Sequence, residues 1–309
     1  MTIYVVGGLG FIGHNVVYRL AKQNEFSKIT VIDNIDNYGI LDTVELASLH
    51  QERVDKIKHF TNVQIQYKDI TDDLVISDAD TIIHLAGYPR AKAVNINPSR
   101  AANVMISGTT QLCEIAARSN AKMIFVSSSM VYGDWKSMKA LETDATTPNS
   151  LYGLLKLQAE EIVKMMCKRY IIIRPSAVYG PRDVTDRVIS KMFEAAIRDE
   201  NIIVHGADNM LDFTYVDDIA NGIASTVYSH HSNVTVNMSN GQARSLGEAA
   251  ALIKSITNSK SLIIYKGSDV LFPSRGAQDI TLAKKLFDFV PKVPLHDGLE
   301  ELYKWLKER

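Results

Sequence analysis

The feature that most constrains this chain is a glycine-rich turn that directly follows its first apolar segment. Residues 3–6 (IYVV) are expected to form a buried strand, and residues 7–13 (GGLGFIG) connect it to an amphipathic helix. Gly7, Gly10 and Gly13 are spaced GxxGxxG, which permits a tight turn and a close approach of the backbone to a ligand. The start of the helix directs free N–H groups toward an anion. The turn therefore predicts an α/β unit that binds phosphate groups.

Apolar strands and amphipathic helices alternate through the first half of the chain. Expected strands cover Ile3–Val6, Ile29–Ile32, Val63–Tyr67, Thr81–Leu85, Met123–Ser127 and Tyr170–Arg174, and expected helices include Ile12–Lys22, Ala101–Ser119 and Leu151–Lys168. This alternation is typical of a parallel sheet that is covered by helices on both faces. We therefore expect an α/β fold with a doubly wound parallel sheet of the Rossmann type.

The alternation ends near Pro175, where prolines and glycines mark irregular chain. Further helices are expected at Val184–Asp199 and Asp217–Ser229, and further strands at Ile202–His205 and Val234–Met238. We predict that residues 1–175 form the Rossmann domain and that residues 212–240 return to it, whereas residues 176–211 and 241–309 form a smaller α/β substrate-binding lobe.

Composition narrows the classes of partner and compartment. The 34 Lys and Arg residues nearly balance the 35 Asp and Glu residues, so nothing indicates a surface for nucleic acid or membrane. Cys113 and Cys167 form no pattern typical of a disulfide framework or a zinc site. We find neither a cleavable leader nor an apolar run long enough to span a bilayer. The expectation is a cytoplasmic protein without a metal site.

An acidic residue ends the second expected strand, 20 residues after Gly13. Asp33 is placed to accept hydrogen bonds from the hydroxyls of an adenosine ribose, and its charge would repel a 2′-phosphate. No Arg or Lys follows it in residues 34–37 (NIDN). The turn and this carboxylate together predict NAD rather than NADP.

Weaker signals end the third and fourth expected strands. Asp69 could hold the adenine amino group, although a role in a turn explains it equally well. Residues 85–87 (LAG) are small enough to let the backbone pass close to the cofactor. His84 is expected to be a packed core histidine rather than a catalytic base.

Spacing alone does not identify a catalytic Tyr–Lys pair. Five tyrosines have a lysine four residues later, namely Tyr18, Tyr88, Tyr132, Tyr152 and Tyr303. Tyr152 differs because residues 148–150 (PNS) supply a turn and an N-cap before a long helix. Tyr152 and Lys156 would then share one face at the start of that helix.

This pairing suits proton transfer coupled to hydride transfer. Free tyrosine has a pKa of about 10, and a Lys ammonium about 4 Å away contributes about 4 kcal/mol at an effective dielectric of about 20. A phenolate at Tyr152 could take a sugar hydroxyl proton while the hydride on carbon moves to NAD⁺. A hydroxyl among residues 127–129 (SSS), at the end of the preceding strand, could orient the substrate oxygen. For Ser129, capping of the strand end is the favoured alternative.

In order and spacing, these motifs resemble the extended short-chain dehydrogenase/reductase family, in its NAD-dependent nucleotide-sugar epimerase and dehydratase branch. The resemblance runs over essentially the whole chain. It also includes residues 84–87 (HLAG), Asn103 with 108–109 (GT), 127–133 (SSSMVYG), 174–182 (RPSAVYGPR) and 212–218 (DFTYVDD). The set is specific for the family and much less specific for one reaction.

The resemblance implies roles for individual residues. Tyr152 would be the catalytic base, Lys156 its modulator and ribose ligand, and Ser128 the catalytic serine. NAD would contact Gly7, Gly10, Phe11, Ile12, Gly13, Asp33, Asn34, Asp69, Ile70, Leu85, Ala86, Gly87, Asn103, Ser127, Tyr152, Lys156 and Ser176. The substrate would contact Ser128, Ser129, Tyr152, Arg182 and Arg275. Family members usually dimerise through helices that here lie near 97–119 and 151–168, which pack into a four-helix bundle.

Two departures from the family pattern narrow the reaction. The family's 4,6-dehydratases carry an Asp-Glu pair where this chain has Ser129 and Met130, and the UDP-glucuronate decarboxylases carry a Glu at the place of Met130. A methionine cannot exchange a proton, so neither reaction is favoured. The leading hypothesis is a 4-epimerase like UDP-glucose 4-epimerase, which oxidises C4, rotates the keto sugar and reduces its other face. A nucleotide-sugar dehydrogenase or ketosugar reductase would use the same groups. A non-catalytic NAD-binding sensor or scaffold is disfavoured by the retained catalytic residues.

Two further departures concern the substrate. The family often has Arg at the place of Leu211, where it binds the diphosphate, and Asn at the place of Ala177. A diphosphate needs cationic or N–H partners, so other groups must supply them here. Arg275 matches the family's second diphosphate arginine, and Arg182 and Arg90 are weaker candidates. Leu211 as an ordinary core residue is an equally open interpretation.

Overall fold

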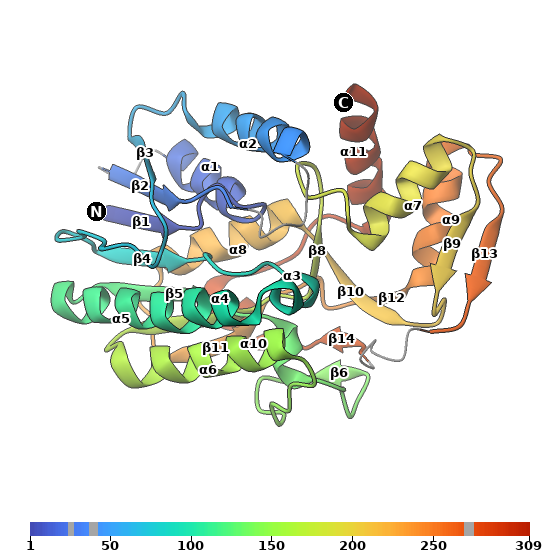
Figure 1. Ribbon diagram of the computed structural model, residues 1–309. Coiled ribbons are helices and arrows are strands. Elements are labelled where there is room, and N and C mark those ends of the chain that lie inside the picture. The colour runs from blue at the N-terminus through green and yellow to red at the C-terminus, as the bar shows by residue number, and fades with distance from the viewer. Residues whose placement is uncertain (24–27, 37–42, 269–274) are drawn as a thin grey trace.

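The computed structural model describes residues 1–23, 28–36, 43–268 and 275–309; Asn37, which ends the stretch after Asp33, lies outside them. A seven-stranded sheet forms the centre of the larger part of the molecule (Figure 1). Its strands are β1 (Thr2–Val6), β2 (Lys28–Asp33), β3 (Val63–Tyr67), β4 (Thr81–His84), β5 (Lys122–Val126), β7 (Tyr170–Arg174) and β11 (Val234–Asn237). Their order is β11-β7-β5-β4-β1-β2-β3, and every pair is parallel. The predicted doubly wound sheet is confirmed.

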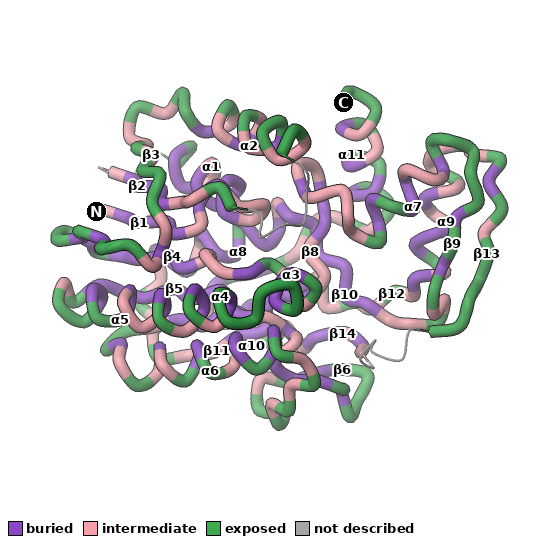
Figure 2. The backbone as a smooth tube through the Cα atoms, in the orientation of Figure 1, coloured by how far each residue is buried: buried purple, intermediate pink, exposed green. Residues whose placement is uncertain are grey.

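Helices cover both faces of this sheet. One face carries α1 (Gly13–Gln23), α2 (Thr43–Ile57), α8 (Val216–Tyr228) and α10 (Thr281–Phe287), and the other carries α3 (Ala91–Ile96), α4 (Pro98–Ala102), α5 (Gly108–Ser119) and α6 (Leu151–Met166). Alternate residues of β1 enter opposite cores: Ile3 and Val5 face α1 and α8, whereas Tyr4 and Val6 face the α5 side. Figure 2 shows the resulting buried strands between two helical layers. This burial explains why the strands are apolar without interruption.

The helix predicted over Ala101–Ser119 is divided. A π-helical segment, η1 (Asn103–Ser107), lies between α4 and α5, and the N–H of Gly108 donates to the carbonyl of Asn103. The hydroxyl of Thr109 donates to the carbonyl of Met105 at 2.6 Å. Such widened turns are common at functional sites, and sequence periodicity alone does not distinguish them from α-helix.

The smaller lobe has its own core (Figure 1). It contains the sheet β8 (Ala177–Tyr179), β10 (Met210–Tyr215) and β12 (Ala243–Ser245), the parallel pair β9 (Ile202–His205) and β13 (Ile263–Lys266), and the helices α7 (Val188–Ile197), α9 (Leu246–Thr257) and α11 (Leu295–Glu308). A short parallel pair, β6 (Lys139–Ala140) with β14 (Ala277–Gln278), lies beside α6, and η2 (Ser129–Tyr132) is a single 3₁₀ turn. The helix α7 starts at Val188, later than predicted, and Asp183 accepts from the N–H of Val184 in the turn that precedes it.

Two segments lie elsewhere than the expected domain boundaries put them. Residues 212–215 belong to β10 and pair with β8 in the lobe, so the return to the large domain begins at Val216. Phe287 and Phe289 pack into the core beneath α8, although residues 241–309 were assigned to the lobe. In each case the packing of the segment, rather than its place in the sequence, decides which part of the molecule it joins.

Candidate functional site

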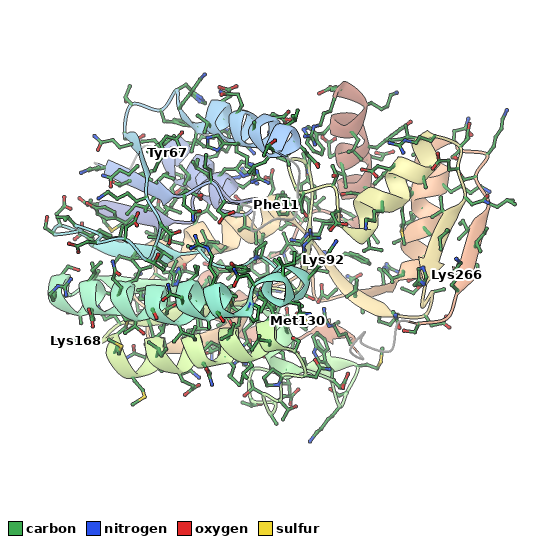
Figure 3. All side chains as sticks on the ribbon, in the orientation of Figure 1. Phe11, Tyr67, Lys92, Met130, Lys168 and Lys266 are labelled. Atoms are coloured by element: carbon green, nitrogen blue, oxygen red, sulfur yellow. The ribbon has the colours of Figure 1, made fainter. Side chains whose placement is uncertain are left out.

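A cleft of about 570 Å³ opens where β1 and β4 lie side by side, and residues of the lobe form its other wall. The chain leaves β1 toward β2 and leaves β4 toward β5, so this is the point where the strand order reverses. In doubly wound sheets ligands bind at this point. Phe11, Lys92 and Met130, which line the cleft, lie in the central region of Figure 3, whereas Tyr67 and Lys266 lie far from it at opposite ends.

The glycine turn brings the backbone close to the floor of the cleft. Gly7 has φ +81°, and a Cβ at this residue would lie 2.4 Å from the backbone nitrogen of Ala86. A Cβ on Gly13 would lie 2.2 Å from the carbonyl oxygen of Gly7. No side chain can replace either glycine without moving the backbone. The close approach that the motif predicts is therefore present.

Asp33 ends β2 with its carboxylate held by the backbone. Its Oδ2 accepts from the N–H of Leu9 and its Oδ1 from the N–H of Ile35, each at 2.8 Å. Burial raises the pKa of Asp33, and the two N–H donors together with Arg53 and His50 oppose that rise. An oriented carboxylate beside the glycine turn suits the ribose hydroxyls of NAD. The chain thus provides both the cradle and the carboxylate that this cofactor requires.

Most of the residues expected to bind the cofactor line this cleft. They are Gly7, Gly10, Phe11, Ile12, Gly13, Asp33, Asn34, Ile70, Leu85, Ala86, Gly87, Ser127, Tyr152, Lys156 and Ser176. Asp69 and Asn103 are not among the described lining residues. Asp69 instead accepts hydrogen bonds from Asn34 at 2.7 Å and from Arg100 at 3.1 Å. It therefore contacts Asn34, which lines the cleft.

Tyr152 and Lys156 lie on the buried face of α6, 9% and 6% exposed. Ser150 caps the helix by accepting from the N–H of Gly153 at 3.2 Å, as its sequence predicts. The ammonium of Lys156 donates to the carbonyl of Val126 at 2.8 Å, and Ser128 lies close enough to Tyr152 to lower its pKa. The helix start therefore places the tyrosine, the lysine and the serine against the end of β5.

Among the other tyrosines with this spacing, Tyr88 also lines the cleft with its partner Lys92. The Nζ of Lys92 donates instead to Asp186 at 2.8 Å, and its side chain is 63% exposed. Tyr18, Tyr132 and Tyr303 are not among the described lining residues. The structure thus separates Tyr152 from the four alternatives that spacing alone left open.

The electrostatic surroundings of the pair differ from expectation. Burial raises the pKa of Tyr152, and the groups that oppose this rise are Ser128, Arg187 and Arg275. The sequence pattern assigns that effect to Lys156, which is not among these groups. Burial lowers the pKa of Lys156 itself to about 8, and its ammonium is bound by a backbone carbonyl. In the folded chain the cations that act on the tyrosine therefore come from the lobe wall.

The expected substrate residues divide into two groups. Ser128, Ser129 and Arg275 line the cleft, and the guanidinium of Arg275 contacts the sulfur of Met130. Arg182 was predicted to contact substrate, but it is not among the described lining residues. Its Nε lies 3.6 Å from Glu52 on α2. Residue 182 lies in a turn with a positive φ of 69°, and its contact with substrate stays a prediction.

Several charged residues of the cleft carried no recognisable motif. Arg53 of α2 is 8% exposed and donates to the carbonyls of Leu9 and Arg182. Arg187 precedes α7, with its Nε 3.2 Å from Asp183. Each arginine belongs to an ordinary helical segment in the sequence, so only the packing of α2 and α7 against the glycine turn and the lobe reveals its place.

Asp186, a carboxylate on the lobe, forms ion pairs with three cationic side chains. Asp186 accepts from Arg90 at 3.0 Å, from Lys92 at 2.8 Å and from Lys191 at 2.6 Å. These cations lower the pKa of Asp186 to about 2. Arg90, a weaker diphosphate candidate from sequence, therefore lines the cleft while pairing across it.

Leu211 and Ala177 both line the cleft. Leu211 is only 6% exposed and also belongs to the lobe core, so it is a core residue that borders the cleft. Within the described residues, no group of three or more His, Cys, Asp or Glu side chains could hold a metal ion. In the same part of the chain, every helix is too short or too polar to cross a membrane. Cys113 and Cys167 are buried free thiols.

Residues 3–238 match the NAD dependent epimerase/dehydratase family. A putative UDP-glucose 4-epimerase of Methanocaldococcus jannaschii is 27% identical over 99% of this chain and 98% of its own. UDP-glucuronic acid decarboxylase 1 of Xenopus tropicalis is 28% identical over 99% of this chain and 72% of its own. Among solved structures, UDP-glucuronic acid 4-epimerase from Bacillus cereus, in complex with UDP-glucuronic acid and NAD, is 26% identical and superposes with a TM-score of 0.89 over 100% of this chain and 99% of its own.

Proposed function

This chain belongs to the NAD-dependent epimerase/dehydratase family, and on that premise we propose that it epimerises C4 of a nucleotide-activated sugar. The observation that carries the proposal is the arrangement of Ser128, Tyr152 and Lys156 beside a glycine turn and an oriented Asp33. Relatives named as UDP-sugar 4-epimerases align over nearly the whole chain. The enzyme is NAD-dependent, and bound NAD supplies the acceptor and later the donor of a hydride.

The chain's own residues handle the substrate proton. Ser128 orients the C4 hydroxyl, and the phenolic oxygen of Tyr152 takes its proton and later returns it. Asp33 would bind the adenosine ribose of the cofactor and Lys156 the other ribose. Gly7 would let the diphosphate of the cofactor approach the backbone. Epimerisation needs the 4-keto sugar to rotate between the two hydride transfers. It consumes no NAD over a full turnover.

The alternative reactions predict different products. A dehydrogenase or ketosugar reductase uses the same serine, tyrosine and lysine but turns over only with added cofactor. A decarboxylase releases carbon dioxide, and the apolar side chain of Met130 in the cleft disfavours it. Epimerase activity is supported because Ser129 and Met130 stand where the dehydratases carry their Asp-Glu pair, and neither side chain replaces that acid and base.

The lobe wall favours a sugar that carries a negative charge. Arg187 and Arg275 line the cleft and both act electrostatically on Tyr152. Burial lowers the pKa of Arg275 to about 10, so its guanidinium stays charged at neutral pH. A hexuronate on a nucleoside diphosphate would place a carboxylate near these cations. We therefore propose UDP-glucuronic acid ahead of UDP-glucose as the substrate to test.

The function is tested with purified protein and a panel of UDP-, GDP-, CDP- and dTDP-sugars. Denatured protein should release NAD, and NMR should show interconversion of two C4 epimers without added cofactor. Epimers share a mass, so mass spectrometry alone would detect only the competing reactions. Protein that lacks NAD and turns over only with stoichiometric NADH would favour a reductase instead.

We propose a homodimer that packs the helices within 97–119 and 151–168 against their copies. On α6 the outward side chains include Leu154, 41% exposed, and Met165, 87% exposed. Leu154→Glu should give a monomer in light scattering, because burying a carboxylate in a helical interface is unfavourable. The same change at Leu262 in the lobe, which is 65% exposed, should leave the dimer intact; dimers in both variants would exclude this interface.

A cytoplasmic location is also proposed, since Cys113 and Cys167 are free thiols and such thiols persist in reducing compartments. Fractionation of cells that produce the protein checks the compartment.

A further inference from the structure

The face of α6 that carries the catalytic pair has a third member. Tyr152, Lys156 and Glu160 are spaced four residues apart, so they lie on one side of the helix. Glu160 is 0% exposed and is not among the described residues that line the cleft. A fully buried carboxylate is expensive unless it is paired and hydrogen-bonded. Its presence one turn behind the lysine therefore needs a structural or catalytic reason.

Each member of this row contacts a different residue at the end of β5. Ser128 lowers the pKa of the tyrosine, the carbonyl of Val126 accepts from Lys156 at 2.8 Å, and the hydroxyl of Ser127 donates to Glu160 at 2.5 Å. Val126, the last residue of β5, and the two serines that follow it thus meet three consecutive turns of the helix. The Ser127–Glu160 contact fixes the far end of this register. It also shows that the hydroxyl of Ser127, expected to contact NAD, is engaged within the protein.

Arg174 on β7 holds the other side of Glu160. Its Nε donates to Oε1 at 2.9 Å and its Nη2 to Oε2 at 2.6 Å, and the two side chains are only 4% and 0% exposed. The remaining Nη1 donates to the hydroxyl of Tyr132 at 2.9 Å. The carboxylate therefore accepts three hydrogen bonds from β5 and β7 and has one defined orientation.

Glu160 is also the carboxylate that acts on the ammonium of Lys156. Burial lowers the pKa of Lys156 to about 8, and the negative charge of Glu160 opposes that fall. The other ionisable groups near this ammonium are Tyr152 on the same helix and His84 on β4. Burial lowers the pKa of His84 to about 3, so that ring is neutral at working pH. Glu160 thus helps to keep Lys156 charged.

We propose that Glu160 is a positioning residue for the catalytic pair: with Ser127 and Arg174 it fixes the register of α6 against β5 and maintains the ammonium of Lys156. It touches neither substrate nor cofactor and acts through its two neighbours. The inference rests on the proposed function, because catalysis by Tyr152 and Lys156 is what the residue supports.

The test replaces the charge and keeps the shape. In Glu160→Gln we expect kcat to fall about 10- to 100-fold, since small misplacements of catalytic groups have effects of this size, while KM changes little. The basic limb of the kcat–pH profile should move about one unit to lower pH, because Lys156 loses its negative neighbour. Glu161→Gln on the same helix, where the side chain is 57% exposed and pairs only with Lys164, should behave as wild type.

Glu160→Gln leaves the Arg174 charge buried and can unfold the protein, so a second variant removes both charges. Replacement of a buried ion pair by apolar side chains of similar size is often tolerated. Glu160→Met with Arg174→Met should fold and should still show the reduced kcat and the shifted basic limb. A folded single or double variant with wild-type kcat and pH profile would overturn the inference.

A measurement without turnover separates this inference from the proposed function. NMR of lysines labelled at Cε follows the titration of Lys156 in wild type and in whichever variant folds. A lower pKa in the variant supports the role of Glu160, and an unchanged pKa refutes it. Wild-type protein that converts none of the nucleotide sugars would instead refute the proposed function.

Discussion

The two walls of the cleft are built in different ways. On the Rossmann wall, the glycine turn, the end of β2 and the start of α6 place the cofactor and the catalytic pair through contacts between adjoining elements. On the lobe wall, Arg187 and Arg275 approach Tyr152 from segments that are far apart in the chain. The groups proposed to carry out the reaction are therefore placed by local backbone geometry, whereas the groups proposed to select the sugar act through side-chain charge.

Among changes to the Rossmann wall, removal of the proposed base should reduce turnover most. In Tyr152→Phe, kcat should fall about 10²- to 10⁴-fold because no group replaces the phenolic proton acceptor, while NAD remains bound. The measurement is turnover by NMR together with the NAD content of denatured protein. Tyr18→Phe, which alters another tyrosine with the same lysine spacing, serves as the matched control. Full activity in Tyr152→Phe would remove the tyrosine from the mechanism.

The glycine turn should tolerate no side chain. In Gly7→Ala the new Cβ would lie 2.4 Å from the backbone nitrogen of Ala86 at a φ of +81°, so we expect NAD to be lost on purification. A residue forced into this region also costs about 1–3 kcal/mol of stability, measurable by denaturant unfolding. Gly267→Ala, where a Cβ has no neighbour within 4 Å, should have neither effect. Retention of NAD in Gly7→Ala would show that the turn is not the cradle.

The lobe wall should respond to the charge of the substrate. In Arg275→Gln, KM for a nucleotide hexuronate should rise about 10- to 100-fold, which corresponds to a charged hydrogen bond of about 1.5–3 kcal/mol. KM for the neutral hexose should change much less. The control is Arg244→Gln, because Arg244 is an exposed arginine that pairs with Glu248. Equal effects on both sugars would assign Arg275 to the shared diphosphate rather than to the sugar.

The smallest effect is expected from pH alone. Burial lowers the pKa of Lys156 from 10.5 to about 8, so the ammonium is present below about pH 8 and is lost above it. Turnover should therefore decline by about tenfold per pH unit above this value. Between about pH 8 and 10 the unfolded chain binds this proton more tightly than the folded chain, so the lysine's contribution makes unfolding less favourable as pH rises. Activity that stays constant to pH 10 would contradict the role of Lys156 as a charged group.

The fold and the Rossmann wall could largely be predicted because their signals lie within short segments. The positive φ of Gly7, the alternation of strands and helices and the capping serine at 150 each depend on neighbours in sequence. The π-helical turn at Asn103–Ser107 and the late start of α7 could not be predicted, because the sequence pattern of both segments is that of an ordinary α-helix.

By itself, then, the amino-acid sequence determined the parallel sheet, and it predicted the NAD cradle and the Tyr152–Lys156 pair. Only the tertiary structure decided that Arg182 turns toward Glu52, that Arg187 and Arg275 surround the tyrosine, and that Glu160 is buried behind the lysine. The physical reason is that backbone geometry is specified by neighbouring residues, whereas the charge state of a buried group depends on desolvation and on partners that folding brings from distant segments.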